Sequence, residues 1–433
     1  MPSVAGFVRN LCAHRPNRLL SAAIILHIFV CAAALVYEAA AYPNYHIFYG
    51  SDRLGEILAG TAAFASFGLI FLLRDFSFGY LISYHFYAMV GGFLWINCFT
   101  DLRYDYKIAG FSAVASGLAF VVPAMFVNID IARPRLSSKL LSSALLYGML
   151  LVAMATIAWA ACYNLNFTTI QHANEVRMQG GVYLPSGVRY AVGVTSSSLL
   201  PFAFAGFFLR KQYVQAGFVI LLLACFYPIT LSKTAFFSPV WLLFVAALSS
   251  YFEARLVSVL ILLIPMSIGL ASTLFPVDPY LFWLLDHRLF VVPANALAIY
   301  NDFFAHHQPT YFCQINAVRA IFGCQYGELG PEFRDIYQQG NYNASLFATE
   351  GIASVGATLA PLPVLFCALM IALANAASRH LTKRFVLISG SVLPQLFLNV
   401  PFSVVMVSMG AGCLFLLWYV SPDHTCEPVR KSV

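Results

Sequence analysis

Hydrophobic residues fill long, nearly unbroken runs along most of the chain, and short polar connectors separate these runs. A helix needs about 20 predominantly apolar residues to cross a bilayer. Runs of this kind predict about twelve membrane-spanning helices, at 19–41, 57–73, 79–98, 108–128, 140–161, 188–209, 213–231, 235–251, 256–275, 351–377, 385–400 and 402–420. The pattern therefore predicts an all-α polytopic membrane protein, with residues 1–433 in a single integral membrane domain.

The composition supports this class and excludes others. Of the 433 residues, 61% are hydrophobic and 10% are charged, whereas soluble domains are only about 45–50% apolar. The formal net charge of +6 comes from basic residues that lie mostly in short connectors. A basic excess placed there indicates topology, not binding to nucleic acid. We therefore expect the lipid bilayer as a partner and no nucleic acid.

The distribution of lysine and arginine predicts the orientation. Short cytoplasmic loops carry an excess of these residues. If the N-terminus is cytoplasmic, every second connector lies inside, and these connectors hold Arg74, Arg133, Arg135, Lys139, Arg210, Lys211, Arg255, Arg379, Lys383 and Arg384. The bias predicts that both termini are cytoplasmic and that two longer segments lie outside. These are 162–187 and a large loop, 276–350, between the ninth and tenth spans.

The large loop concentrates polar chemistry. It contains the candidate catalytic residues Arg288, Arg319, His306 and His307, and Glu350 at its end. Within it, the stretch 289–304 is apolar enough to lie in the membrane interface as a helix. Tyr311 follows as an interfacial anchor and a candidate substrate contact. The loop also contains Cys313 and Cys324, which could form a disulfide in an oxidising compartment.

Several residue types in these segments suit a phosphorylated sugar substrate. Arginine donates bidentate hydrogen bonds to phosphate and stays charged, so Arg177 in the first outer segment is a candidate substrate contact. Amide and aromatic side chains suit sugar hydroxyls and ring faces; here they are Asn341, Tyr342 and Asn343. The chain has no HExxH or DxD pattern, so we expect neither a metal site nor a cofactor.

Other charges have competing interpretations. Lys233 and Glu350 border apolar runs, where ionisable residues are functional candidates, although a side chain at a helix end can also reach interfacial water. The sequence favours a structural pairing of Arg334 with Asp335 or Glu332. For a general base, the candidates are His306, His307, Asp302 and Glu350.

At this point the chain resembles the Wzy-type oligosaccharide repeat-unit polymerases of bacteria, which make O-antigen and exopolysaccharide. The resemblance rests on an even number of spans with two enlarged outer loops, and on an arginine in each loop, Arg177 and Arg319. Arg319 and Gly330 match an Arg-x10-Gly spacing. Arg288-x4-Pro293 opens the large loop, and an asparagine-rich exit, GNYNASLFATEGIASVG, closes it.

The resemblance implies a metal-independent glycosyltransferase in the bacterial inner membrane. Its substrate would be a polyprenyl-diphosphate-linked oligosaccharide, polymerised on the outer face. Arg288 and Arg319 would stabilise the diphosphate leaving group, and Arg177 would hold the second carrier or its glycan. A chain-length regulator and a flippase are candidate partners.

Two other functions stay open from the sequence. An O-antigen ligase-type transferase would deliver glycan to lipid A core through a similar outer loop. A polysaccharide flippase or another secondary transporter belongs to a different class. Transporters tend to show repeated halves and charge near the centre of the membrane. The sequence has no visible repeat, and its charges lie mostly outside the predicted spans.

Overall fold

The computed structural model describes residues 16–49, 54–132, 139–169, 172, 176, 183–275, 280–339, 342 and 349–422. These residues form helices and no β-strand, and their only extended pairing is an isolated bridge between Ile47 and Thr100. Contacts divide the chain into two compact units. Unit 1 comprises Met1–Asn128, Arg255–Ala372 and Gln395–Phe402, and unit 2 comprises Ile129–Ala254, Leu373–Pro394 and Ser403–Val433.

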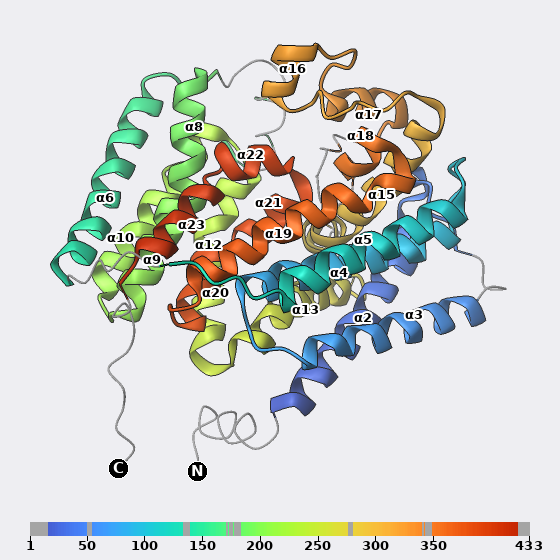
Figure 1. The fold of residues 1–433 in the computed structure, drawn as a ribbon, viewed down its shortest axis with the longest axis horizontal. Coiled ribbons are helices and arrows are strands. Elements are labelled where there is room, and N and C mark those ends of the chain that lie inside the picture. Colours follow the sequence, from blue (N-terminus) through green and yellow to red (C-terminus); the bar gives the residue numbers. More distant parts are fainter. Residues whose placement is uncertain are drawn as a thin grey trace. The chain divides into compact units, whose positions relative to one another are not determined.

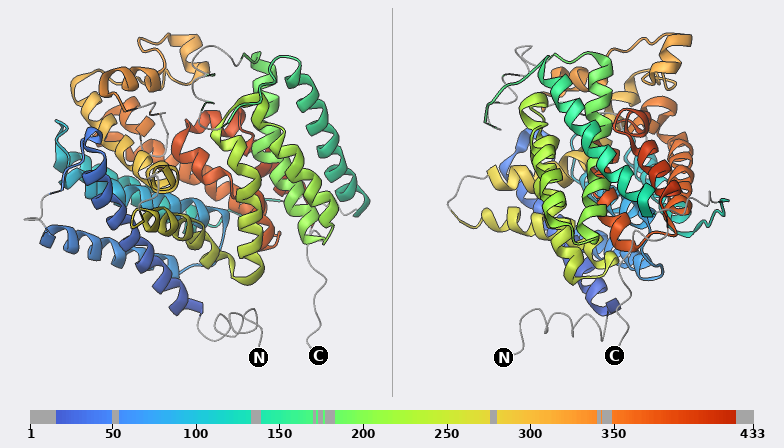
Figure 2. Two further views of the ribbon diagram at one scale, coloured as in Figure 1. Left: turned by 180° about the vertical axis from the view of Figure 1, so that it is seen from behind. Right: turned by 90° about the vertical axis from the view of Figure 1, so that its left-hand side faces the viewer.

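Unit 1 contains the N-terminal helices and those of the middle of the chain (Figures 1 and 2). They are α2 (Pro16–Ala41), η1 (Pro43–Tyr45), α3 (Leu54–Gly68), η3 (Leu69–Leu72), α4 (Phe78–Cys98), α5 (Tyr106–Phe126), α13 (Ala254–Ser272), α14 (Tyr280–Phe282), η5 (Trp283–Val291), α15 (Val292–His306), α16 (Asn316–Phe322), α17 (Leu329–Tyr337) and α18 (Thr349–Leu359). Most of α19 (Pro361–Ser378) and of α21 (Leu393–Asn399) also belongs to this unit.

The core of unit 1 is built around α4, which is buried along nearly its whole length. This helix begins at Ser77, whose hydroxyl accepts a hydrogen bond from the Tyr80 N–H at 3.1 Å, a cap worth about 1 kcal/mol. The rings of Tyr80 and Tyr84 meet Phe71 edge-on at 5.3 and 5.2 Å. Helices α5 and α15 flank α4, so the residues of α15 are held against a rigid core.

Unit 2 contains the remaining helices. They are α6 (Lys139–Ala161), α8 (Ser186–Val194), η4 (Thr195–Leu199), α9 (Leu200–Leu209), α10 (Tyr213–Ala224), α11 (Tyr227–Thr230), α12 (Lys233–Tyr251), α20 (Lys383–Gly390), α22 (Phe402–Val407) and α23 (Ala411–Val420). Helix α9 packs against α10, α6 and α20. Some buried polar groups are paired between helices, for example Trp418 Nε1–H with Ser389 Oγ at 3.0 Å, which offsets the cost of burying them.

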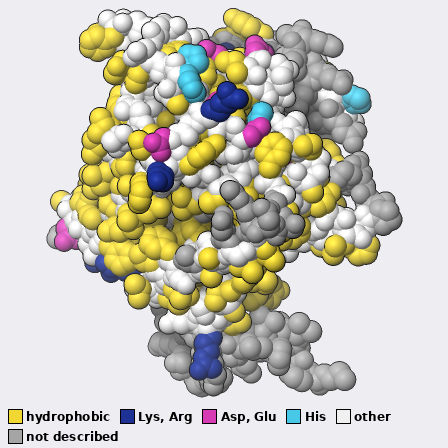
Figure 3. Space-filling view, turned by 90° about the vertical axis from the view of Figure 1, so that its right-hand side faces the viewer, with side chains coloured by type: hydrophobic (Ala, Val, Ile, Leu, Met, Phe, Trp, Pro, Cys, Tyr) yellow, Lys and Arg dark blue, Asp and Glu magenta, His cyan; other side chains and the backbone are white. Residues whose placement is uncertain are grey.

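Nine helices in the described part of the chain are long and apolar enough to cross a membrane. They are Asn17–Ala41, Tyr106–Phe126, Ser142–Ala161, Ser186–Leu209, Tyr213–Thr230, Lys233–Tyr251, Ala254–Ser272, Tyr280–His306 and Pro361–Ser378. On the face drawn in Figure 3, hydrophobic side chains cover much of the middle, while histidine and acidic side chains gather toward the upper end. This architecture is consistent with a polytopic membrane protein. The twelve spans and the cytoplasmic termini stay predictions.

The structure differs from the sequence analysis at residues 289–304, which we expected to form an interfacial helix in an outer loop. They belong to a continuous helical segment, Tyr280–His306, that is long and apolar enough to cross a membrane. Its α15 part is largely buried against α4 and α18. The charged residues near its start lower its average hydropathy, which is why the apolar pattern did not predict a span there.

The last three predicted spans are also divided. The predicted span 351–377 breaks between α18 and α19, where Gly356 has a φ of 78°, a conformation that glycine adopts readily. Pro361 then begins α19, as proline can at a first helical turn. The predicted spans 385–400 and 402–420 each become two shorter helices.

Candidate functional site

Arg288 lies on η5, a π-helical segment between α14 and α15. π-Helical turns are rare and are found frequently at functional sites. The guanidinium carbon lies 4.6 Å from the centre of the Trp283 ring, a cation–π contact. Arg288 is exposed, and no described carboxylate forms an ion pair with it. Its charge is therefore positioned but not neutralised by the described residues.

A hydrogen-bond network lies beside Arg288 and joins three segments of unit 1. The amide nitrogen of Asn295, at the start of α15, lies 3.1 Å from the Tyr342 hydroxyl and 3.3 Å from both the Tyr45 carbonyl and Gln339 Oε1. The Tyr342 hydroxyl donates to Gln339 Oε1 at 2.9 Å. Asn295 is buried and its Oδ1 has no described partner. The network fixes the positions of two phenol groups near the arginine.

Electrostatics connect Arg288 to these phenols. Burial raises the pKa of the Tyr45 phenol; the positive charge of Arg288 opposes this rise, and the negative charge of Glu38 adds to it. Burial also raises the pKa of Tyr342, against the hydrogen bond from Asn295 and the charge of Arg288. The two tyrosines are therefore neutral hydroxyl donors at physiological pH, next to a cation.

Glu350 is connected to the same network through Tyr300. The Tyr300 hydroxyl lies 3.5 Å from the Tyr342 carbonyl oxygen, and Tyr300 also interacts electrostatically with Glu350. Burial raises the pKa of Glu350 to about 7, and a hydrogen bond from the Phe402 backbone opposes the rise. A carboxyl group that titrates near neutrality is suited to accept or donate a proton.

We expect this burial to make stability depend on pH. Because the pKa of Glu350 lies above its ordinary value of 4.5, the folded protein binds more protons than the unfolded chain in this interval, and stability falls as pH rises from about 4.5 to about 7. At pH 8 the free energy of unfolding should be about 3 kcal/mol lower than at acidic pH because of this group. Thermal unfolding in detergent should show a lower midpoint at about pH 8 than at about pH 5.

The matched variants are Glu350→Gln and Glu328→Gln. Glu350→Gln removes the titrating group, so this pH dependence should shrink, while Glu328→Gln changes an exposed carboxylate of the same unit and should leave it intact. An equal pH dependence in wild type and Glu350→Gln would contradict the assignment.

His287, the residue before Arg288, forms a buried carboxylate–imidazole pair with Glu38 that the sequence analysis missed. His287 Nδ1 is 2.8 Å from Glu38 Oε1, and the two side chains are 1% and 0% exposed. Asp286 is also fully buried, and neither of its oxygens has a described partner. A single glutamate near the end of the apolar run 19–41 was the available signal, since ionisable residues inside spans are functional candidates.

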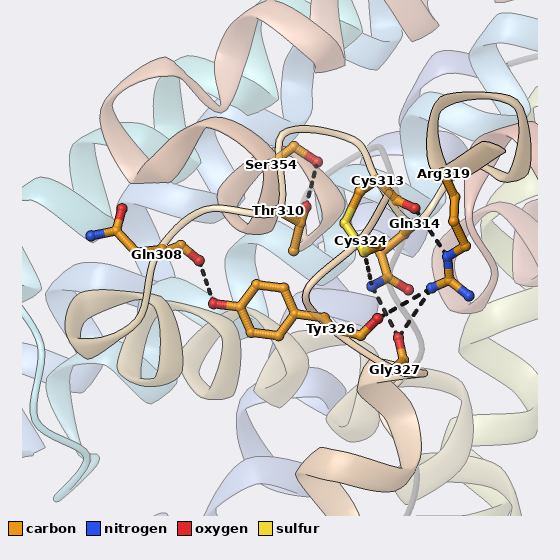
Figure 4. The surroundings of a disulfide bond; sticks show 9 residues. All are labelled: Gln308, Thr310, Cys313, Gln314, Arg319, Cys324, Tyr326, Gly327 and Ser354. Atoms are coloured by element: carbon orange, nitrogen blue, oxygen red, sulfur yellow. Dashed lines mark hydrogen bonds between the residues drawn. A yellow bond between two sulfur atoms is a disulfide. The ribbon is translucent and has the colours of Figure 1, made fainter. Parts of the chain in front are cut away.

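Arg319 lies in a disulfide-closed loop (Figure 4). Cys313 and Cys324 form a disulfide, one of the possibilities that the sequence left open. Arg319 donates to the carbonyl oxygens of Cys313, Tyr326 and Gly327 at 3.3 to 3.4 Å. No described contact joins Arg319 to Arg288, so its predicted role at a diphosphate stays a prediction, while its observed role is to hold this loop together.

We expect Arg319→Ala to loosen the loop. The change removes three donated hydrogen bonds, each worth roughly 1 kcal/mol, and leaves the disulfide in place. Limited proteolysis should therefore cut faster between residues 313 and 327 than in wild type. Arg334→Ala is the control, because Arg334 pairs with its neighbour Asp335 at 3.0 Å; equal cleavage in both variants would contradict this role.

The other candidate residues of the large loop have local partners. His306 and His307 are exposed at the end of α15, and each Nδ1–H donates to a backbone carbonyl one turn earlier. Asp302 accepts hydrogen bonds from the Arg103 N–H and the Tyr337 hydroxyl, both at 2.6 Å. Tyr311 is exposed. Among the candidates for a general base, Glu350 is buried and has a pKa near neutrality.

Four predicted site residues cannot be combined with this site. Arg177, Asn341 and Asn343 lie outside the described residues. Lys233 is the first residue of α12, which belongs to unit 2, whereas Arg288 belongs to unit 1. Within the described residues, no group of three or more histidine, cysteine, aspartate or glutamate side chains could hold a metal ion.

An apolar groove of about 490 Å³ lies between helices α2, α3, α4 and α5 of unit 1. Phe290, two residues after Arg288, contributes to its lining, as do Leu35, Phe64 and Gly91. Its polar groups are few; they include Thr61 and the amide of Asn97. A groove of this composition suits a hydrocarbon chain and not a sugar.

Comparisons with models of protein families, with curated proteins and with solved structures found no match for this chain.

Proposed function

We propose that the protein is a membrane glycosyltransferase that polymerises polyprenyl-diphosphate-linked oligosaccharide units on the outer face of a bacterial inner membrane. The observation that carries the proposal is the guanidinium of Arg288, which has no described carboxylate partner and lies beside Tyr45 and Tyr342. A planar cation of this kind suits a diphosphate, which it can bind through two parallel hydrogen bonds.

The proposed reaction needs two aids that this site can supply. The hydroxyl oxygen of the acceptor sugar attacks the anomeric carbon of the carrier-linked glycan, and the bond from that carbon to the diphosphate oxygen breaks. Arg288 stabilises the negative charge that develops on the departing diphosphate. Glu350 accepts the proton that the acceptor hydroxyl loses, because its pKa of about 7 lies near the working pH.

Two further features support the proposal. The apolar groove between α2 and α5 is suited to the lipid part of the carrier. The Cys313–Cys324 disulfide is typical of an oxidising compartment, in agreement with an outer position for that loop. A chain-length regulator and a flippase would act on the same glycan and are proposed partners.

An assay with defined acceptors separates a polymerase from a ligase. Purified protein in liposomes is given carrier-linked repeat units alone, or the same units with lipid A core. Lengthened carrier-linked glycans in the first reaction support the polymerase. Product formed only in the presence of lipid A core would contradict it and favour an O-antigen ligase-type transferase.

A transporter is the second candidate, because one observation favours it. Glu38, Asp286 and His287 are buried together within helices, and ionisable groups inside a membrane often lie on substrate or proton paths. A flippase would move an unextended glycan across liposome membranes. The proposed polymerase would lengthen glycans without moving them.

A further inference from the structure

Three ionisable side chains form a buried cluster in unit 1, which we call the carboxylate–histidine cluster: Glu38, Asp286 and His287. All are 0 to 1% exposed. Glu38 Oε1 and His287 Nδ1 are hydrogen-bonded at 2.8 Å. The other carboxylate oxygens and His287 Nε2 have no described partner. Asp286 packs so closely on Gly269 of α13 that any Cβ there would collide with its carboxylate.

The groups around the cluster offer little opposite charge. From α2, Cys31 faces Asp286, and its Sγ lies 3.6 Å from His27 Nε2. From α4, the Tyr84 hydroxyl lies 2.8 Å from His27 Nδ1, and His85 lies near His27. Tyr42, which precedes η1, and Tyr45 of η1 contact the His287 ring, with ring centres 5.9 and 4.6 Å apart. Of these groups, the histidines alone can become cations.

The nearest arginine in sequence does not neutralise the cluster. Arg288 is exposed, stacks on Trp283 and forms no described ion pair. A protonated His287 can offset the negative charge of only one carboxylate, that of Glu38, to which it is hydrogen-bonded. A second ionised carboxylate in this buried position would cost several kcal/mol. No described group of ligands could hold a metal ion instead.

We propose that the carboxylate–histidine cluster is a proton-binding site, in which Asp286 carries an exchangeable proton at neutral pH. The site is separate from the proposed sugar chemistry and stands under either candidate function. His27, Cys31 and Glu38 are spaced by four and seven residues and so lie on one face of α2. These three residues form a line of polar groups along α2 that runs from Glu38 to His27. His27 and His85 line a cavity of about 10 Å³, which has room for about one water.

The direct test is infrared spectroscopy of the purified protein, which detects the carbonyl stretch of a protonated carboxylic acid. The Glu350→Gln variant is used, because Glu350 also titrates near pH 7 and would contribute its own band. We expect the acid band of this variant at neutral pH, lost when Asp286→Asn is added and shifted in D2O. Asp302→Asn is the matched control, because Asp302 lies outside the cluster and accepts hydrogen bonds from the Arg103 N–H and the Tyr337 hydroxyl; adding this change to Glu350→Gln should keep the band. No band in Glu350→Gln, or a band that persists after Asp286→Asn is added to it, would overturn the proposal.

A second measurement uses the wild-type chain and so does not depend on how a variant folds. Protein with an isotopically labelled aspartate carboxyl carbon should show the acid band at lower frequency. Asp286 is the only buried aspartate among the described residues, so that shift would assign the proton to it. A band that shifts only with labelled glutamate would overturn the assignment. Neither outcome depends on glycan polymerisation.

Discussion

Arg288→Ala should lower the rate of glycan polymerisation by roughly 100- to 1,000-fold, the loss typical of removing one charge-stabilising donor from an active site. The reason is that no other described cation lies in the Tyr45–Tyr342 network. Arg288→Lys should recover only part of the rate, because an ammonium group cannot donate two parallel hydrogen bonds. The measurement is the initial rate of glycan lengthening by purified protein in liposomes.

The control for this prediction is Arg334→Ala. Arg334 is half-exposed and paired with Asp335, and we expect a rate close to that of wild type. If Arg288→Ala is inserted in the membrane, elutes like wild type and still makes full-length polymer at an unchanged rate, Arg288 does not stabilise the leaving group.

Glu38→Ala should destabilise the folded protein by about 3–5 kcal/mol, because it leaves His287 buried without its partner. Glu38→Gln should cost less, since an amide can still accept the hydrogen bond from the imidazole. The measurement is unfolding in mixtures of mild and denaturing detergent, followed by circular dichroism.

The chain provides a matched exposed pair as a control. His46 and Asp101 are also 2.8 Å apart, but their side chains are 35% and 51% exposed. Asp101→Ala should therefore cost only about 0–1 kcal/mol. Similar losses in Glu38→Ala and Asp101→Ala would contradict a special contribution from the buried pair.

Much of the helical architecture could be predicted from the apolar pattern. Predicted spans at 108–128, 140–161 and 235–251 agree closely with helices Tyr106–Phe126, Ser142–Ala161 and Lys233–Tyr251. These helices are continuous and contain few charges, so a hydropathy argument suffices. The break at Gly356 was not predicted, because it depends on a backbone conformation that hydropathy does not report.

The segment Tyr280–His306 shows why a charged span is hard to recognise. Asp286 and Arg288 resemble loop residues in the sequence. In the structure Asp286 is buried against Gly269, whereas Arg288 stacks on Trp283. These contacts come from residues that are adjacent only after folding.

The candidate site was predicted only in part. Arg288, Tyr342 and Glu350 were named from residue chemistry. In the structure Arg288 interacts electrostatically with Tyr342, Asn295 holds the Tyr342 hydroxyl, and Tyr300 lies between Tyr342 and Glu350. The connecting residues are Asn295 at the start of α15 and Tyr300 in its middle, and the sequence offers no sign of which residues they contact. Arg319 was named by spacing, but its observed partners are backbone carbonyls, which no side-chain pattern can indicate.

The most direct test of the proposed function measures two products of one reaction. Protein in liposomes is incubated with carrier-linked repeat units, and both glycan length and free polyprenyl diphosphate are measured over time. Glycosyl transfer predicts that one polyprenyl diphosphate is released for every linkage formed. Glycans that cross the membrane unextended, with no polyprenyl diphosphate released, would contradict the account.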